Sequence, residues 1–394
     1  MITHAEIEKL LAVHCARPEV LSLYLRVPAD PPALRGLPDR AENLIAQAAQ
    51  AARSEPPEAG DARARDDARH IARRTLEVHA RQWLGHSVAI FASGEPGLAE
   101  SIMLPCLVED RAVLATRPHV RPLLLALQRS PGYYLAIADG QRAWVFRVTD
   151  GRTDRMTVPA GITSPGFGGW YSLEEHRAHE PVTQLAAHPC GDMAGVLGRI
   201  MHGRGPERLV IGGSPEGIRQ FLAALADDAR DRFIGSFAAD PAAMTLTRIE
   251  EQAGEISRRR AETSERRLAE RVRHQADGLA AVGLEACLKA VNEGAIGVLI
   301  VPPGGLIPGY ACQRCGQLSS TGTDCPDWGA AAMAVPDLLE EMAVRVLHDG
   351  GLVETVDDPP GRVAALLQFQ LPAAEGPTGA GRGATAQFAV AAWG

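Results

Sequence analysis

The clearest local fold signal in the chain is Tyr133-Tyr134-Leu135-Ala136-Ile137-Ala138-Asp139-Gly140, which Gln141–Val148 follows. Asp-Gly between two apolar runs is typical of a two-residue type I′ turn that joins antiparallel strands. A third strand is expected near Arg155–Val158, where Pro159 ends it. The middle of the chain is therefore predicted to contain a sheet built around this hairpin.

A glycine-rich segment, Pro165-Gly166-Phe167-Gly168-Gly169-Trp170, comes next. Glycine lets the backbone adopt positive φ and approach a partner closely, at an entropic cost. Tryptophan has a large apolar face that is usually covered by a core or by a partner. Gly168, Gly169 and Trp170 therefore have two interpretations: a plain loop with an inward Trp, or a loop that presents the Trp to a partner.

The residues after this loop predict partly helical structure over Tyr171–Gln184, interrupted by Pro181. Arg208–Ser214 predicts a buried strand that leads into a helix at Pro215–Leu225. The turn Gly212-Gly213-Ser214 either holds a phosphate on the helix N-terminus or simply makes a tight turn.

Arg248–Gln275 predicts one long charged helix, because its arginines are mixed with nearly as many carboxylates. Such mixing is typical of a solvated helix with i,i+4 ion pairs, and the length suits a connector between domains. Its candidate RNA-binding residues are Arg258, Arg259, Arg260, Arg266 and Arg267.

The two ends of the chain predict further α/β structure. The N-terminal part has a helix after Thr3, an alternating, half-buried strand at Val20–Val27, helices near Asp39–Arg53 and Asp61–Trp83, strands near His86–Ala92 and Ser101–Val108, and a helix near His119–Gln128. The C-terminal part has a helix at Leu284–Asn292, a strand at Ile296–Val301, an amphipathic helix at Pro336–His348, and strands at Leu352–Val356 and Val363–Leu371.

Three of the seven cysteines cluster in sequence. Cys312-x2-Cys315-Gly and Cys325-Pro-x2-Gly outline a zinc ribbon, in which two turns supply four tetrahedral ligands. Trp328 stands where the fourth cysteine belongs. Cys312, Cys315 and Cys325 therefore either bind zinc with a ligand from elsewhere, or belong to a decayed ribbon whose turns persist through packing.

Length and charge limit the class of protein. A chain of 394 residues suggests two or three domains, and a net charge of −8 excludes a bulk polyanion binder, so any RNA contact needs local basic patches. Met1–Glu8 lacks the basic and apolar regions of a secretion signal, and no apolar run approaches the roughly 20 residues of a membrane helix. We therefore expect a cytoplasmic protein without a membrane partner.

The order of these segments resembles the bacterial relatives of the archaeal and eukaryotic class-one release factors and Pelota, a group that includes Balon-like ribosome hibernation and rescue factors. The likeness is closest over Asp277–Gly294, continues through the ribbon and Pro336–Gly351, and extends from about Tyr133 to Val356. The N-terminal part matches only loosely.

The resemblance implies an α/β protein of three domains. Residues 1–130 would form an N-terminal α/β domain facing the decoding centre. Residues 131–275 would form a ribonuclease-H-like middle domain reaching the peptidyl transferase centre. Residues 276–394 would form a domain related to kink-turn RNA-binding proteins, with the degenerate zinc ribbon.

In the release factors of this group the middle-domain loop carries Gly-Gly-Gln, whose backbone N–H stabilises an oxyanion and whose amide admits water. Gly168 and Gly169 match, and Trp170 replaces the Gln. Indole has one donor and no acceptor, so it does not orient water as an amide does. Only Arg177 remains of the arginine-rich helix that follows in the family. A Trp is instead suited to stack on a nucleobase, for about 1–3 kcal/mol.

The resemblance therefore predicts a monomeric, ribosome-associated factor that occupies the A site against rRNA, in hibernation or stalled-ribosome handling, without cleaving a bond. A translational GTPase is a candidate partner and zinc a candidate cofactor. Two alternatives stay open. The retained glycines favour a rescue or release factor that hydrolyses peptidyl-tRNA, and the net acidity favours a non-ribosomal scaffold for protein contacts.

Overall fold

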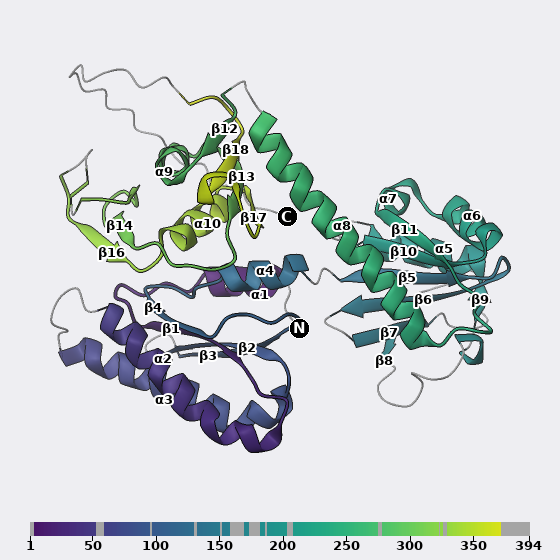
Figure 1. Cartoon of the computed structure of the whole chain (residues 1–394), viewed down its shortest axis with the longest axis horizontal. Helices are drawn as coiled ribbons and strands as arrows, with labels where there is room; N and C mark the ends of the chain where they lie inside the picture. Colours follow the sequence, from purple (N-terminus) through teal and green to yellow (C-terminus); the bar gives the residue numbers. More distant parts are fainter. Residues whose placement is uncertain are drawn as a thin grey trace.

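The computed structural model describes residues 4–52, 59–94, 97–129, 132–149, 152–157, 169–172, 182–185, 187–202, 208–274, 278–322, 324–325 and 329–371. Within these residues the strands form four sheets, with helices packed against them (Figure 1). The expected mixed α/β class is confirmed. No helix in these ranges combines the length and the apolar character needed to cross a membrane.

The N-terminal sheet is antiparallel, with strand order β3-β2-β1-β4. Its strands are β1 (Val20–Arg26), β2 (Ser87–Ser93), β3 (Leu98–Leu104) and β4 (Arg111–Ala115). The helices and 3-10 turns of this part are α1 (His4–Leu11), η1 (Pro31–Gly36), α2 (Leu37–Ala51), α3 (Ala59–His79) and η2 (Ala80–Trp83). The helices match the sequence expectations, whereas β4 had no clear signal.

Strand β1 is buried on both faces, so the expectation of a half-buried strand is wrong. Leu21, Leu23 and Leu25 pack in one core with α2 and α3. Tyr24, on the opposite face, belongs to a second core that includes α1 and α4 (Arg121–Arg129). The alternation of polar and apolar residues fails here because Ser22 is buried too, where its hydroxyl accepts a 2.9 Å hydrogen bond from the backbone N–H of His119.

The middle sheet has seven strands in the order β11-β10-β5-β6-β7-β8, with β9 paired to β6. Its strands are β5 (Tyr133–Ala138), β6 (Arg142–Thr149), β7 (Arg152–Thr157), β8 (Gly169–Ser172), β9 (His188–Pro189), β10 (Arg208–Gly213) and β11 (Phe233–Ala238). One face packs against α5 (Cys190–Met201), α6 (Pro215–Ala224) and α7 (Asp227–Arg230). The other face packs against the first half of α8 (Leu246–His274), beside the 3-10 turn η3 (Val182–Gln184).

The predicted hairpin is present as β5 and β6, but its turn is not type I′. A type I′ turn needs positive φ at both central residues. Gly140 has φ +98°, whereas Asp139 is not among the described non-glycine residues with positive φ. The Asp139 carboxylate instead accepts hydrogen bonds from the backbone N–H groups of Gln141 (3.2 Å) and Arg142 (2.8 Å). The turn is therefore stabilised by hydrogen bonds to the Asp139 side chain, and not by positive φ at both central residues.

The C-terminal part holds two sheets. The larger has the order β12-β18-β13-β17 and the smaller the order β15-β14-β16. Their strands are β12 (Ala280–Val282), β13 (Ile296–Val301), β14 (Gly309–Cys312), β15 (Leu318–Ser319), β16 (Ala332–Val335), β17 (Leu352–Thr355) and β18 (Ala364–Leu367), accompanied by α9 (Leu284–Asn292), α10 (Leu338–His348) and η4 (Pro360–Arg362). The suggested edge strand at Gln387–Trp393 lies outside the described residues.

The N-terminal and C-terminal sheets share one hydrophobic core. Val120 and Leu123 of the α4 region lie in the same buried cluster as Leu339 and Met342 of α10. The buried clusters of the middle sheet contain no described residue from either end of the chain, apart from the linking helix. The described part of the chain thus consists of a joined N- and C-terminal unit and a separate middle unit.

Helix α8 joins these two units as one continuous rod (Figure 1). Ile249 and Ala253 pack against the middle sheet. Leu268 and Val272, about four turns and more beyond Ala253, pack against the C-terminal sheet with Ile300. The middle of α8 therefore crosses between the two packed ends.

Candidate functional site

The three clustered cysteines are held by two turns with the same backbone hydrogen bonds. In the first turn Cys312 N–H donates to the Gln317 carbonyl (2.9 Å) and Gly316 N–H donates to the Cys312 carbonyl (2.9 Å). In the second turn Cys325 N–H donates to Ala330 and Gly329 N–H donates to Cys325, each at 2.8 Å. Both turns therefore place a cysteine first and a glycine four residues later.

Each of these glycines is required by its backbone conformation. Gly316 has φ +72° and Gly329 has φ +57°, a region that L side chains rarely adopt. The two turns of a ribbon are thus present, and the first carries two cysteines where the second carries one. The residue that corresponds to Cys315 in the second turn is Trp328, which lies outside the described residues.

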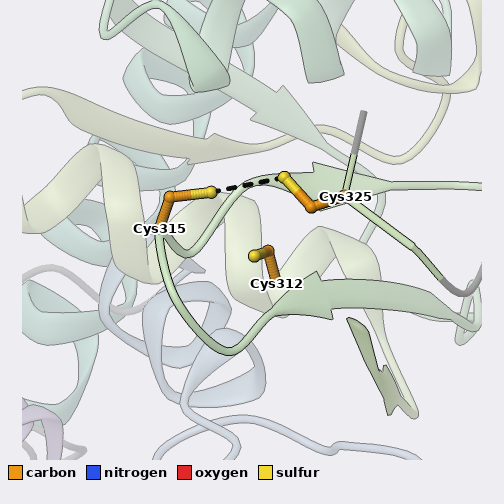
Figure 2. Close-up of side chains that lie close together, drawn as sticks. All are labelled: Cys312, Cys315 and Cys325. Atoms are coloured by element: carbon orange, nitrogen blue, oxygen red, sulfur yellow. Dashed lines mark hydrogen bonds between the residues drawn. The ribbon is translucent and has the colours of Figure 1, made fainter. Parts of the chain in front are cut away.

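The three thiol groups converge in space (Figure 2). The Sγ atoms of Cys312, Cys315 and Cys325 all lie within 4.8 Å of one another, and those of Cys315 and Cys325 are 3.6 Å apart. Four sulfurs placed about 2.3 Å from a tetrahedral zinc would be separated by about 3.8 Å. The spacing therefore fits a single zinc ion, for which these residues would supply three thiolates.

The first turn also favours a thiolate. Hydrogen bonding to the backbone N–H of Cys315, and of Arg314 at 3.4 Å from the sulfur, lowers the pKa of Cys312 to about 7. Loss of solvation raises the pKa of Cys315 to about 11. Because the thiolate is the form that binds metal, Cys312 is prepared as a ligand near neutral pH.

The candidate RNA-binding arginines lie on the exposed part of α8. Arg258, Arg259, Arg260, Arg266 and Arg267 are all solvent-exposed. Arg258 and Arg259 each form a 2.7 Å ion pair with Glu255. No carboxylate in the described part of the chain pairs with Arg260, Arg266 or Arg267. These three guanidinium groups are therefore available to an anionic partner.

Arg208 of β10 adds a further positive charge beside this part of α8. Its guanidinium donates to the carbonyl of Ser257 at 3.3 Å, and burial together with the neighbouring charge of Arg260 lowers its pKa. A local basic patch thus exists on a chain of net charge −8.

Gly169 and Trp170 begin an edge strand, which corrects the expectation that both lie in a loop. β8 pairs antiparallel with β7, Gly169 opposite Thr157 and Trp170 opposite Met156. β8 lies at the end of the middle sheet opposite β11. Tyr171 and Ser172 are in the same strand, so the helix predicted from Tyr171 does not begin there. Gly168 and Arg177 fall outside the described residues.

The turn at Gly212-Gly213-Ser214 serves packing. A Cβ on Gly213 would lie 2.0 Å from the Ala138 carbonyl oxygen, and one on Gly217 would lie 2.5 Å from the same oxygen. The Ser214 hydroxyl accepts from the Gly217 N–H at 3.0 Å and caps α6. These contacts support the tight-turn interpretation, because the glycines admit the neighbouring strand.

A buried charged cluster lies where α4 meets α10. His119 Nε2 is 3.1 Å from an Asp337 carboxylate oxygen, and the Arg121 guanidinium is 2.9 Å from the same oxygen. Glu340 accepts from the backbone N–H groups of Val120 (2.6 Å) and Arg121 (3.0 Å). The four side chains of His119, Arg121, Asp337 and Glu340 are all buried.

This cluster neutralises two helix N-termini that meet head to head. Asp337 caps α10 through a 3.2 Å hydrogen bond from Leu339 N–H, while Glu340 caps α4. Burial opposes the charged form of Asp337, but the hydrogen bond from His119 and the charge of Arg121 prevail, so its pKa is lowered. Asp337-x2-Glu340 before an apolar run is a cap signal that sequence reasoning missed. His119 and Arg121, which lie more than 200 positions earlier, have no comparable sequence signal.

Comparison with known families gives one match. The model of bacterial archaeo-eukaryotic release factor family 10 matches residues 118–258, which span α4, the middle sheet and the first half of α8. This match confirms the resemblance to the bacterial relatives of the archaeal and eukaryotic release factors and Pelota. None of the curated proteins compared with the chain matches it.

Several solved structures are similar to the chain at low identity. An archaeal translation termination factor, aRF1, is 12% identical, with 93% of this chain and 96% of that chain covered and a TM-score of 0.24. Pelota from Archaeoglobus fulgidus is 14% identical over 73% and 81%, with a TM-score of 0.29. Dom34 from S. cerevisiae is 11% identical over 75% and 82%, with a TM-score of 0.39.

Proposed function

We propose that this chain is a ribosome-associated translation factor of the release-factor type that occupies the A site without cleaving a bond. The observation that carries the proposal is the sequence Gly168-Gly169-Trp170 within residues 118–258, which match the release-factor family, where the resemblance assigns Trp170 to the position of the catalytic Gln. The match supports the type of factor, and the exchange of amide for indole supports occupancy over hydrolysis.

The proposed contact of Trp170 is a nucleobase. The strand position of Gly169 and Trp170 gives this end of the middle sheet a fixed backbone, paired through β7 to the rest of the unit. Stacking on rRNA or tRNA would then contribute about 1–3 kcal/mol.

The proposed electrostatic contact is the exposed part of α8. Arg260, Arg266 and Arg267 are exposed and have no partner among described carboxylates, so they can neutralise phosphates without first breaking an ion pair. Arg258 and Arg259 would first have to leave Glu255. A factor of this kind would be cytoplasmic, with a translational GTPase as its candidate partner.

Zinc is the proposed cofactor of the C-terminal part. The three converging thiols and the two matched turns support it. The ion would hold the turns that carry β14, β15 and β16 together, and it would have a structural role remote from Trp170. Structural zinc sites usually stabilise the segment that supplies their ligands.

The direct test is cosedimentation of the purified chain with vacant ribosomes, combined with a peptide-release assay on stalled complexes. We expect ribosome binding that competes with A-site tRNA, and peptide release no faster than the background. Release that depends on the chain would favour the hydrolytic alternative. A complete lack of ribosome binding at low and moderate salt would favour the scaffold alternative and overturn the proposal.

A further inference from the structure

We propose that the cavity lined by Arg26, Arg111 and Arg129, at the junction of the N- and C-terminal parts, binds a phosphoryl group. A free phosphate compound and an RNA backbone both present this anion, and experiment distinguishes the two sources. The inference is independent of the ribosomal role, because none of these residues belongs to α8 or to the thiol cluster.

The cavity is small and is shared by both parts of the joined unit. Its volume is about 240 Å³, just below the roughly 300–1,000 Å³ of pockets for drug-sized ligands, so it suits a phosphate or a small phosphate ester. Arg26 ends β1, Arg111 begins β4 and Arg129 ends α4. Gly304 and Asp357, which follow β13 and β17, line the cavity from the C-terminal part. A ligand bound here would therefore contact both parts.

Arg111 is the most buried of the three arginines. Its side chain is 14% exposed, and its Nη1 atom is buried without a hydrogen-bond partner. Its Nη2 atom has the Glu109 carboxylate at 3.4 Å, a long contact for an ion pair. A Cβ on Gly304 would lie 3.8 Å from Nη2, so the C-terminal part covers this guanidinium group. The charge of Arg111 is thus only partly compensated by the protein.

Arg121 adds a second buried positive charge beside Arg111. Asp337 pairs with its Nη2 atom at 2.9 Å, but its Nε and Nη1 atoms are buried without a partner. Burial, together with the charge of Arg121, lowers the pKa of Arg111. Both groups stay protonated at neutral pH, so two cations remain close together away from water. An anion in the cavity would offset their repulsion.

Arg26 and Arg129 are exposed and supply the outer donors. The Nε atom of Arg26 donates to the Val108 carbonyl at 2.8 Å, which orients its guanidinium group. Within the described ranges, no carboxylate forms an ion pair with the Arg26 side chain. Arg129 pairs with Asp357, whose side chain is 73% exposed. Planar guanidinium groups bind phosphate oxygens through two parallel hydrogen bonds, so both side chains can bind a phosphoryl group from the solvent side.

The balance of charge and the shape of the site favour phosphate. Three guanidinium groups face two lining carboxylates, Glu109 and Asp357. Water and salt screen these exposed carboxylates more than they screen the covered Arg111, so the potential in the cavity is positive. A tetrahedral phosphate presents oxygens in several directions, which matches donors from three elements. A carboxylate presents two oxygens in one plane and would engage fewer of them.

The test is calorimetric titration of the full chain with inorganic phosphate, with adenosine monophosphate and with acetate, at constant ionic strength set by sodium chloride. We expect one saturable phosphate site per chain and weaker binding of acetate. A second arm measures binding of a short labelled single-stranded RNA to the wild type and to Arg26→Gln. Phosphate binding identifies a free phosphate compound as a ligand, whereas RNA binding that alone depends on Arg26 identifies the backbone. Loss of neither in Arg26→Gln would overturn the inference.

Variants with opposite expected effects separate binding from misfolding. Arg26→Gln and Arg129→Gln should each weaken binding by about 10-fold, because each removes charged hydrogen bonds. Glu109→Gln should strengthen it by about 2- to 5-fold, because it removes a competing exposed carboxylate. Arg219→Gln is the matched control, since it removes the same charge from an exposed position on α6 and should leave the affinity unchanged. Equal affinities of all three arginine variants, or weaker binding by Glu109→Gln, would contradict the site.

Discussion

The carboxylate of Glu340 in α10 accepts a 3.0 Å hydrogen bond from the backbone N–H of Arg121, the first residue of α4. One helix thus supplies the N-terminal cap of another helix more than 200 residues away in sequence. The side-chain amide of Gln128 adds two further contacts: it donates to the Val353 carbonyl and accepts from the Thr355 N–H of β17, at 2.7 Å each. Together these hydrogen bonds make α4 an integral part of the C-terminal unit. The N- and C-terminal parts are therefore expected to move as one body.

Glu340→Ala should destabilise this joined unit by about 2–4 kcal/mol, because it leaves two buried N–H groups without an acceptor. The measurement is hydrogen exchange of the amides in α4, read with the denaturant midpoint. Glu109→Ala is the matched control, since its carboxylate is 75% exposed and its 3.4 Å ion pair with Arg111 should contribute less than about 1 kcal/mol. Unchanged protection of α4 in Glu340→Ala would contradict the capping role.

Asp337 should make the joined unit acid-sensitive. Its folded pKa is lowered by His119 and Arg121 despite burial, so its stabilising contribution is complete above its unfolded value of about 3.9 and is lost as the pH falls through the folded value. Burial raises the pKa of Glu341, whose contribution has the opposite sign and is lost as the pH rises. The unfolding free energy should therefore fall more steeply below about pH 4 in the wild type than in Asp337→Asn. Unfolding free energies that fall with the same slope below about pH 4 in the wild type and in Asp337→Asn would contradict this role of Asp337.

The paired and unpaired arginines of α8 provide a controlled test of RNA binding. Arg266→Ala with Arg267→Ala should weaken binding to ribosomes and reduce the slope of log affinity against log salt by about 1–2. Arg258→Ala with Arg259→Ala removes the same charge from residues already paired with Glu255 and should have the smaller effect. Binding constants measured over a salt series distinguish the two. Equal effects would show that pre-existing ion pairs do not determine the contribution of each arginine.

Zinc content separates the ribbon from an ordinary packed turn. The chain purified without chelator should contain about one zinc per molecule, and Cys325→Ser should lose most of it together with the order of β14 to β16. Cys106→Ser, on a half-buried cysteine far from the cluster in sequence, is the control and should keep the metal. The measurements are the zinc content by elemental analysis and the melting temperature of the wild type and both variants. Metal-free wild type with an unchanged melting temperature would favour the decayed ribbon.

Several elements could be predicted from local sequence because their signals are local. The long helix expected at Arg248–Gln275 is α8 at Leu246–His274, where mixed charges form local pairs such as those of Glu255 with Arg258 and Arg259. Helix α5 had no such signal, because Cys190–Met201 contains three glycines that lower helix propensity. It forms because Met193, Val196 and Leu197 are buried against the middle sheet, and that gain exists only after the sheet has assembled.

The residue types of the candidate site could be predicted from the sequence, but their positions in the fold mostly could not. The cysteine spacing indicated the thiol cluster directly, since each turn is a local structure. The strand position of Trp170 was not predictable, because its pairing with Met156, fourteen positions earlier in the chain, depends on the partner strand. His119 and Asp337 were missed as a pair for the same reason, since neither carries information about the other in sequence.

Trp170→Ala gives the most direct test of occupancy by stacking. The quantity is the dissociation constant of the chain for vacant ribosomes, measured at fixed moderate salt for the wild type and for Trp170→Ala, with A-site tRNA as competitor. The account predicts competitive binding that Trp170→Ala weakens by about 5- to 150-fold, which corresponds to roughly 1–3 kcal/mol of lost stacking. Equal dissociation constants for the two proteins, or binding that A-site tRNA does not displace, would contradict it.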